Sequence, residues 1–239
     1  IFNNINSKFR IDFWNIDYKN RIEVESSQAM LNLNPNGSSI TRNSNGELIG
    51  VTTTYFNEES TEVSGVDVSY ETLINLERKG SVMFAIKGTS INKFLTPEIK
   101  DGDVEEHIQM ANRVGKFNYD ANTHSLPKKR INAFINWNFR DYGFNLNARH
   151  VDGYSNERPI NDLGLTYGYK NKVDSFLVFD FSASKLIKLN NGEMDLKFSI
   201  INIFDESAPR LYDAPDFSFD SRVHDPRGRI IGLNLEYRK

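Results

Sequence analysis

Apolar and polar residues alternate along several stretches of the chain. Near its end, every second residue from Leu196 to Ile200 is apolar, and Lys197 and Ser199 stand between them. After a long polar segment the alternation resumes, with apolar members Ile231, Leu233, Leu235 and Tyr237. Because successive side chains of a strand point to opposite faces, this pattern predicts two strands whose faces meet different environments.

The same unit recurs through the sequence and predicts eight strands. We expect them at about residues 9–24, 62–76, 82–87, 130–140, 144–149, 177–184, 194–200 and 231–237. Short turns, each with a glycine, are expected at 77–80, 141–143 and 190–192. The other connections are long and polar, and they cover 26–60, 95–125, 155–171 and 206–224. Short turns therefore alternate with long loops.

This alternation of connections separates two classes of all-β protein. In a transmembrane β-barrel, short turns collect at one membrane surface and long loops at the other. A soluble β-sandwich has no such requirement, and its strands usually run for ~5–6 residues. We therefore predict an all-β fold, an antiparallel transmembrane β-barrel with lipid against its apolar face and a hydrated or plugged interior. A soluble β-sandwich binding module or hydrolase domain is the alternative outside membranes.

Composition narrows the function further. The 239 residues carry a formal net charge of -3, so no basic excess points to nucleic acid. Cysteine is absent, which excludes disulfides and thiolate chemistry. No apolar run approaches the ~20 residues of a membrane helix, whereas a spanning strand needs only ~9–11. The sequence starts Ile1-Phe2-Asn3 without an initiating Met or a signal peptide, and we interpret it as the C-terminal part of a longer protein.

One short helix is predicted inside the loop 95–125. Asp103 can cap its first turn, with Glu106 as the capping-box partner. Gly115 is the expected stop. The apolar side of this helix would consist of Val104, Ile108 and Ala111.

Aromatic residues gather around the short turn at 141–143. They are Trp137, Phe139, Tyr142 and Phe144. Transmembrane barrels carry aromatic girdles at the membrane interfaces, so this cluster indicates that the turn lies at such an interface. Ordinary aromatic packing in a soluble sheet is the alternative.

Longer motifs in the sequence resemble the C-terminal barrel portion of TonB-dependent outer-membrane receptors. The first strand contains Phe13-Trp14-Asn15-Ile16-Asp17-Tyr18-Lys19-Asn20-Arg21-Ile22, and the second opens with Ser64-Gly65-Val66-Asp67-Val68. The others are Leu126-Pro127-Lys128-Lys129-Arg130-Ile131-Asn132 with Trp137, Asn202-Ile203-Phe204-Asp205, and Asp225-Pro226-Arg227-Gly228-Arg229. In this order and at these strand positions, the motifs cover almost the whole sequence.

The resemblance implies both a fold and a function. The fold is a barrel of the ~22-stranded plugged class, of which residues 1–239 would be the last eight strands. The function is uptake of a scarce nutrient across the outer membrane of a Gram-negative bacterium, with energy supplied by TonB. The nutrient is chiefly a ferric siderophore, and otherwise haem, cobalamin or an oligosaccharide. A self-standing eight-strand barrel is the alternative within membranes.

The resemblance also implies partners. The TonB complex would act through a plug and TonB box upstream of Ile1, and the other partners are a small-molecule ligand, the lipid bilayer and the barrel-assembly machinery. That machinery reads an aromatic residue at the end of many members, and here Tyr237 stands two places before Lys239. No cofactor is implied. No nucleophile elbow, phosphate-binding glycine loop or metal-hydrolase motif is present in the sequence, so we expect no enzyme.

Two sets of residues are candidate metal ligands, namely the acidic residues of one loop and the four histidines. An oxygen-rich cation site would use Asp101, Asp103, Glu105, Glu106 and His107. These residues lack the remaining spacing of a calcium-binding loop, so a solvated acidic loop is the prediction. The four histidines, which also show no metal-ligand spacing, are predicted at the surface and are His107, His124, His150 and His224.

Two further groups of charged residues are given structural roles. In the motif at 225–229 we expect Pro226 to end a loop, Gly228 to allow close strand approach, and the arginines to pair with interior carboxylates. The second group lies on the polar strand faces, where contact with the plug or charge pairing is expected, and comprises Lys87, Arg149, Asp180 and Lys197. Ligand-binding residues are not indicated, because specificity depends on loop geometry.

Overall fold

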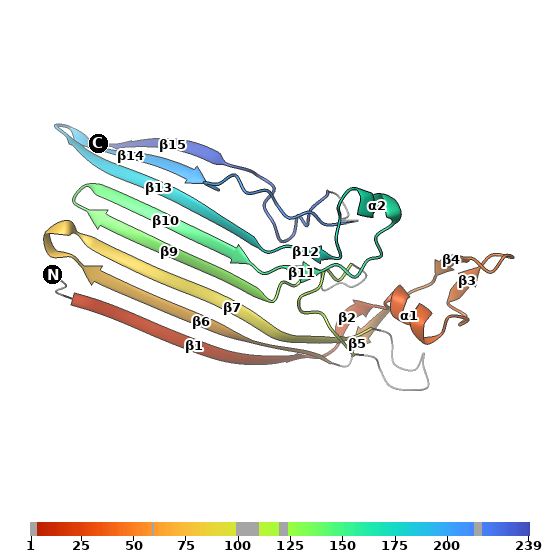
Figure 1. Ribbon diagram of the computed structural model, residues 1–239. Coiled ribbons are helices and arrows are strands. Elements are labelled where there is room, and N and C mark those ends of the chain that lie inside the picture. The colour runs from red at the N-terminus through yellow and green to blue at the C-terminus, as the bar shows by residue number, and fades with distance from the viewer. Residues whose placement is uncertain (1–3, 59, 99–109, 120–123, 213–216) are drawn as a thin grey trace.

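The computed structural model describes residues 4–58, 60–98, 110–119, 124–212 and 217–239. Its main element is one antiparallel sheet of long strands (Figure 1). In sheet order the strands are β1 (Asn4–Tyr18), β6 (Thr61–Asn75), β7 (Ser81–Pro97), β9 (Lys129–Phe139), β10 (Tyr142–Val151), β13 (Phe176–Leu189), β14 (Gly192–Ile201) and β15 (Ile230–Arg238). The predicted all-β class and these eight strands are confirmed within the described residues.

The first strand begins and ends earlier than predicted. It ends at Tyr18, and Asn20 then adopts a left-handed conformation with φ 56°, which asparagine tolerates better than most residues. The following segment, β2 (Arg21–Val24), pairs with β5 (Tyr55–Glu58) and leaves the main sheet. The prediction of one continuous strand to Val24 is therefore wrong, because the backbone turns at Asn20.

Short and long connections lie at opposite ends of the sheet (Figure 1). The short ones are 76–80, which contains the 3-10 helix η1 (Glu77–Lys79), 140–141 and 190–191. The long loops are 19–60, 98–128, 152–175 and 202–229. Their further elements are α1 (Ser27–Leu33), β3 (Ile40–Arg42), β4 (Leu48–Val51), β11 (Tyr154–Ser155), α2 (Asp162–Thr166) and β12 (Lys172–Val173). The predicted asymmetry of the connections is confirmed.

The helix predicted inside the loop 95–125 is wrong at its C-terminal half. Met110–Asn112 form strand β8, which pairs with residues 95–97 of β7. β7 runs beyond the last residue that pairs with β9, which is Ser90, so its outer part needs another hydrogen-bonding partner. The capping residues Asp103 and Glu106 lie outside the described residues.

The register gives the sheet two chemically different faces. One row that crosses all eight strands is apolar and consists of Ile5, Ile74, Val82, Trp137, Phe144, Ala183, Phe198 and Leu233. The neighbouring row on the other face contains Asn4, Asn75, Ser81, Asn138, Gly143, Ser184, Lys197 and Asn234. We call these two surfaces the apolar face and the polar face. The period-two alternation thus sorts side chains as predicted.

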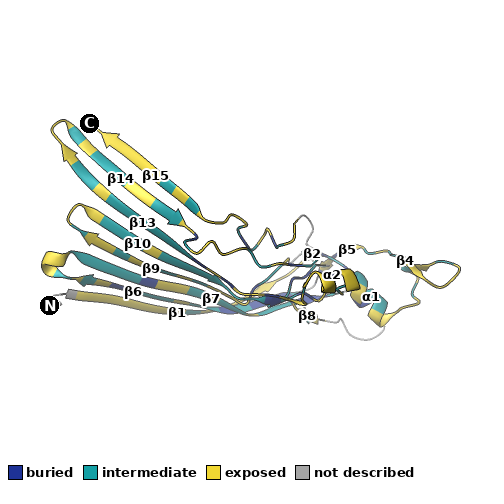
Figure 2. Cartoon of the chain, turned by 45° about the horizontal axis from the view of Figure 1, so that its top comes forward, coloured by how far each residue is buried: buried dark blue, intermediate teal, exposed yellow. Residues whose placement is uncertain are grey.

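No second layer covers the apolar face within the part of the chain that the structure describes. Phe13 is 80% exposed, Leu233 73% and Phe9 62%. Figure 2 shows buried residues gathered where the long strands run into the loops, while most of each strand is intermediate or exposed. The apolar core therefore lies at the loop end, and it consists of Phe117, Tyr154, Val173 and Leu211 with Tyr119 and Val223 against them.

The sheet is open at both sides. β1 and β15 stand at the two ends of the strand order and do not pair with each other. Each therefore has one edge of backbone donors and acceptors that no described strand satisfies. No helix in the described ranges is long and apolar enough to cross a membrane.

Gly80 makes the first short turn possible. Its backbone, with φ 86° and ψ -149°, lies in a region that is accessible essentially to glycine alone. A Cβ atom added there would stand 1.9 Å from the carbonyl oxygen of Asn138 on the neighbouring strand. The turn between β6 and β7 therefore depends on a glycine for both conformation and space.

We expect Gly80→Ala to destabilise the fold by ~1–3 kcal/mol through backbone conformation alone, with the contact to Asn138 adding to it. Chemical denaturation followed by tryptophan fluorescence measures the change. Gly50→Ala is the matched control, because no atom lies within 4 Å of a Cβ built on Gly50. Equal denaturation midpoints for Gly80→Ala and Gly50→Ala would contradict the role given to Gly80.

Candidate functional site

The polar face carries charged residues of both signs, and they pair with each other. Lys87 lies 2.8 Å from Glu71 on the adjacent strand, and Arg10 lies 2.6 Å from Asp12. Lys197 faces Ser184 and Asn234 in register. The surface therefore presents many hydrogen-bonding groups with little net charge, which suits contact with water or with another polar surface.

Arg149 and Asp180 form the most connected pair on this face. The guanidinium Nε and Nη2 donate to the two carboxylate oxygens at 3.0 and 3.1 Å. Asp180 also accepts from the Asn147 side chain at 3.2 Å and from the backbone N–H of Asn202 at 2.9 Å. Asn202 has φ 54° and begins the loop 202–229. The predicted charge pairing is confirmed for this pair, which also fixes where the last loop leaves the sheet.

The motif at 225–229 is held by contacts within the loop 202–229. Arg227 pairs with Asp225 at 2.7 Å, and the hydrogen bonds from its side chain and backbone lower the pKa of Asp225 to about 2. The backbone N–H of Arg229 donates to Asp205 at 2.7 Å, and a Cβ on Gly228 would stand 2.5 Å from the same carboxylate. The close approach predicted for Gly228 is present, but it is made by Asp205. The predicted pairing with interior carboxylates is wrong for Arg227, whose carboxylate partner belongs to its own turn.

A second cluster orders the start of the loop 19–60. Arg21 donates to Glu58 and to Glu23, each at 2.5 Å, and its guanidinium lies 5.6 Å from the centre of the Phe94 ring. Both carboxylates are buried, and Thr61 donates its hydroxyl to Glu58. Buried charges persist only when they are paired and hydrogen-bonded, so this cluster fixes β2 and β5 to the sheet. No pattern in the sequence predicts this cluster, since Arg21 and Glu58 are 37 positions apart.

A third cluster joins the loops 152–175 and 202–229. The Tyr154 hydroxyl donates to Asp220 at 2.9 Å and lies 3.4 Å from Nε2 of His224. The imidazole stacks parallel to the Tyr154 ring and receives the Phe176 ring edge-on, with centroids 6.1 and 5.3 Å apart. Burial raises the pKa of Tyr154 and lowers that of His224. Together these residues form a lock between two loops.

The surface position predicted for His224 is wrong, because the residue is only 3% exposed within this lock. Of the other histidines, His124 is exposed beside Arg222, and His150 lies 3.0 Å from Asp152. Burial and the nearby Arg222 lower the pKa of His124. The acidic residues at 101–107 lie outside the described residues. Within the described ranges no group of three or more histidine, aspartate or glutamate residues is arranged to hold a metal.

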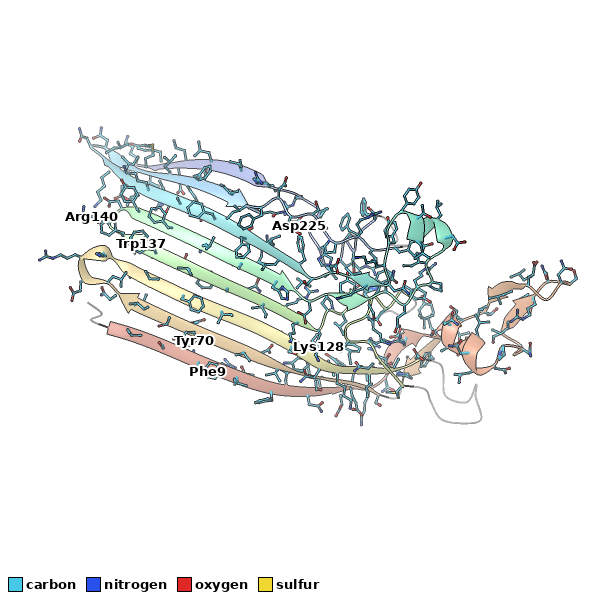
Figure 3. The ribbon with its side chains drawn as sticks, viewed as in Figure 1. Phe9, Tyr70, Lys128, Trp137, Arg140 and Asp225 are labelled. Atoms are coloured by element: carbon cyan, nitrogen blue, oxygen red, sulfur yellow. The ribbon has the colours of Figure 1, made fainter. Side chains whose placement is uncertain are left out.

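The aromatic residues at the turn 140–141 form a contact group on the apolar face, and their position at a membrane interface stays a prediction. Trp137 stacks on Phe144 with centroids 5.3 Å apart, and its indole N–H donates to the Lys79 carbonyl at 2.9 Å. Arg140 lies 5.0 Å from the centre of the Phe139 ring. Figure 3 places Trp137 and Arg140 at the turn end, opposite the end that carries Lys128 and Asp225. The sheet thus has an aromatic rim at one end and ordered polar loops at the other.

Acidification should loosen the lock around His224. Burial and Arg130 hold its folded-state pKa below 6.5, whereas Asp220 opposes them less strongly. The unfolded loop therefore binds more protons than the folded loop. The stability that neutral His224 contributes is fully present above the pKa of the unfolded state, and it is lost as the pH falls toward the lower pKa of the folded state. We expect amide exchange at 217–224, corrected for intrinsic rates, to speed up between about pH 7 and about pH 5.

The strands β13 and β14 provide the internal reference for that exchange measurement, and we expect no matching change there. His224→Gln should remove most of the acid response, whereas His150→Gln should retain it, because His150 contacts Asp152 and is not part of this lock. An acid response that survives His224→Gln would show that another group controls the lock.

A comparison with protein families matches residues 2–203 to the family described as TonB dependent receptor-like, beta-barrel. The match covers all but one of the long strands and the complete loops 19–60, 98–128 and 152–175. A search of curated proteins finds no match to the chain. Members of the matched family act in outer-membrane transport and are not enzymes. The chain therefore belongs to the TonB-dependent receptor-like β-barrel family, as the motifs in its sequence predict.

Proposed function

We propose that residues 1–239 form the C-terminal eight strands of a plugged barrel of ~22 strands, which takes up a ferric siderophore or another iron complex with energy from TonB. The observation that carries this proposal is the uncovered apolar face. Soluble proteins rarely expose contiguous apolar patches larger than a few hundred Å². Lipid is the solvent that makes such a face stable.

The height of the apolar face supports a membrane environment. β9 has eleven residues, from the aromatic rim at Phe139 to the charged Lys129. At ~3.3 Å per residue the strand spans ~33 Å. A tilt of ~40° reduces this to ~25 Å, which matches the apolar band of a transmembrane barrel.

The open edges of β1 and β15 support a larger barrel. In lipid every backbone donor and acceptor must be paired within the protein, so spanning sheets are closed. A self-standing eight-strand barrel requires β1 to pair with β15, and these strands do not pair here. We therefore assign the missing partners to further strands of the same protein, with a plug and TonB box upstream of Ile1.

A soluble β-sandwich is less consistent with the structure. A sandwich packs a second sheet against the apolar face at a spacing of ~10 Å. In the described part of the chain β8 extends the main sheet at β7, and the other remaining strands form only two-stranded pairs at the loop end. The large face is left without a covering layer, which a soluble domain would need.

The loops are the proposed site of ligand capture. The Arg21 cluster holds part of the loop 19–60, and the Tyr154 lock holds parts of the loops 152–175 and 202–229, so these segments are ordered before a ligand arrives. Preorganised loops lose less conformational entropy on binding. The iron-complex substrate rests on the family's usual role in nutrient uptake, because no described residue selects one nutrient over another.

Charge should be tolerated on one face only. We expect Ile135→Lys, in the middle of β9 on the apolar face, to destabilise the folded barrel by ~2–4 kcal/mol because the ammonium would enter lipid. Asn136→Lys is the matched control on the polar face of the same strand, where the ammonium stays hydrated. Denaturant unfolding in lipid vesicles measures both. Similar costs for the two variants would contradict a lipid-facing apolar surface.

Fractionation and uptake test the proposed function directly. We expect the complete protein in the outer membrane, with a heat-dependent shift in gel mobility that marks a folded barrel. Cells that express it should accumulate radiolabelled iron from one or more siderophores, and loss of TonB should abolish that uptake. A folded barrel that supports uptake of a glycan instead of iron would support the proposed receptor function and contradict the proposed iron substrate. Recovery in the soluble fraction would reject the receptor itself.

A further inference from the structure

Four aromatic rings at the turn end of the apolar face form one continuous stack. Trp137 stacks on Phe139 and on Phe144, with ring centroids 6.0 and 5.3 Å apart. Phe144 in turn stacks on Tyr142, with centroids 6.4 Å apart. The contacts run along β9 and back along β10, so the two ends of the stack, Phe139 and Tyr142, are register partners beside the turn. We call these four rings the aromatic stack.

A cation stands over each end of the aromatic stack. The Arg140 guanidinium lies 5.0 Å from the centre of the Phe139 ring, and the Lys185 ammonium lies 5.0 Å from the centre of the Tyr142 ring. Tyr142 faces Phe139 on one side and Lys185 on the other, in register across β9, β10 and β13. Neighbouring strands are ~4.8 Å apart. Both cations therefore belong to one small patch at the turn-end margin of the apolar face (Figure 3).

The two cations have no acidic partner within the part of the chain that the structure describes. Arg140 and Lys185 are exposed, and neither forms an ion pair there, although Asp141 follows Arg140 directly. On the polar face, by contrast, Lys87 pairs with Glu71. A guanidinium has five N–H donors and an ammonium has three, and the rings beneath them supply no oxygen acceptor. These donors are thus free to bind an anion from outside the chain.

The surface beneath the cations, toward the middle of the sheet, is apolar. Ala183 lies one strand repeat of two residues, ~7 Å, from Lys185 on β13. Phe144 and Phe198 flank Ala183 in register on the neighbouring strands. A hydrocarbon chain that runs along β13 from Lys185 therefore meets a small residue with an aromatic ring on each side.

We propose that this patch binds an anionic phospholipid, with the phosphate between Arg140 and Lys185 and an acyl chain over Ala183. The inference rests on the proposed membrane-spanning function, in which short turns face the periplasm. The leaflet on that side of an outer membrane is built from phospholipid. Charge complementarity selects an anionic lipid, because two cations near the membrane surface attract a phosphate and repel the ammonium of a zwitterionic headgroup.

Native mass spectrometry of the complete protein in mild detergent tests this site. The probes are phosphatidylglycerol and phosphatidylethanolamine with identical acyl chains. We expect Arg140→Gln and Lys185→Gln each to weaken phosphatidylglycerol binding about fivefold, and the double variant to remove its advantage over phosphatidylethanolamine. Ala183→Leu should weaken both lipids, because it fills the path of the acyl chain and leaves the charges in place.

Three control variants lie outside the site. Lys188→Gln removes a lysine from the polar face of β13, and Lys129→Gln removes one from the loop end of the apolar face. Ala133→Leu adds the same volume as Ala183→Leu in the middle of the apolar face. All three should bind both lipids as the unaltered protein does.

Three outcomes would overturn the site. One is equal binding of the two lipids by the unaltered protein, and another is a loss in Lys188→Gln as large as that in Lys185→Gln, since net charge alone would then explain the preference. The third is a dimer that Ala183→Leu dissociates, because a second copy of the protein would then be the occupant.

Heat-dependent gel mobility of each variant separates this inference from the proposed function. A folded outer-membrane barrel without the predicted lipid preference rejects the phospholipid site alone. A soluble protein without the mobility shift rejects both.

Discussion

Backbone pairing between long antiparallel strands is the constraint on which the rest of this structure depends. Lipid offers no hydrogen bonds, so a proposed membrane sheet has to satisfy its donors and acceptors strand by strand. The eight long strands pair in one continuous order that leaves only the outer edges of β1 and β15 open, and β8 supplies a partner for the part of β7 that extends past β9. Once pairing fixes the register, the period-two pattern assigns each side chain to either the apolar face or the polar face.

The sequence predicts what depends on local pattern. The two faces were predictable because alternation is a property of neighbouring residues, and the short turns were predictable from residues such as Gly80. The helix expected at 103–115 shows the limit, since Met110–Asn112 become a strand only because a distant edge needs a partner. The turn at Asn20 and the burial of His224 were missed for the same reason, as both depend on contacts with residues 38 and 70 positions away.

Buried polar contacts hold the loops where apolar packing is scarce. The loop core contains few apolar residues among those described. The Arg21 cluster adds paired charges that fix the loop 19–60 to the sheet, and the Tyr154 lock adds hydrogen bonds that connect two loops. Removing one member of such a network leaves its partner buried and unsatisfied, so these contacts specify a particular loop arrangement more than they add stability. A receptor that recognises a solute through its loops benefits from that specification.

Two glycines show how the faces are adapted to different neighbours. Gly65 stands opposite Trp14, and a Cβ there would lie 2.3 Å from the indole, so the missing side chain admits an aromatic ring on the polar face. Gly88, on the apolar face, has no ring above it and leaves a groove instead. The first glycine is explained by packing within the chain. At the second, a Cβ would make only ordinary contact with Ile131, so packing within the sheet does not require a glycine there.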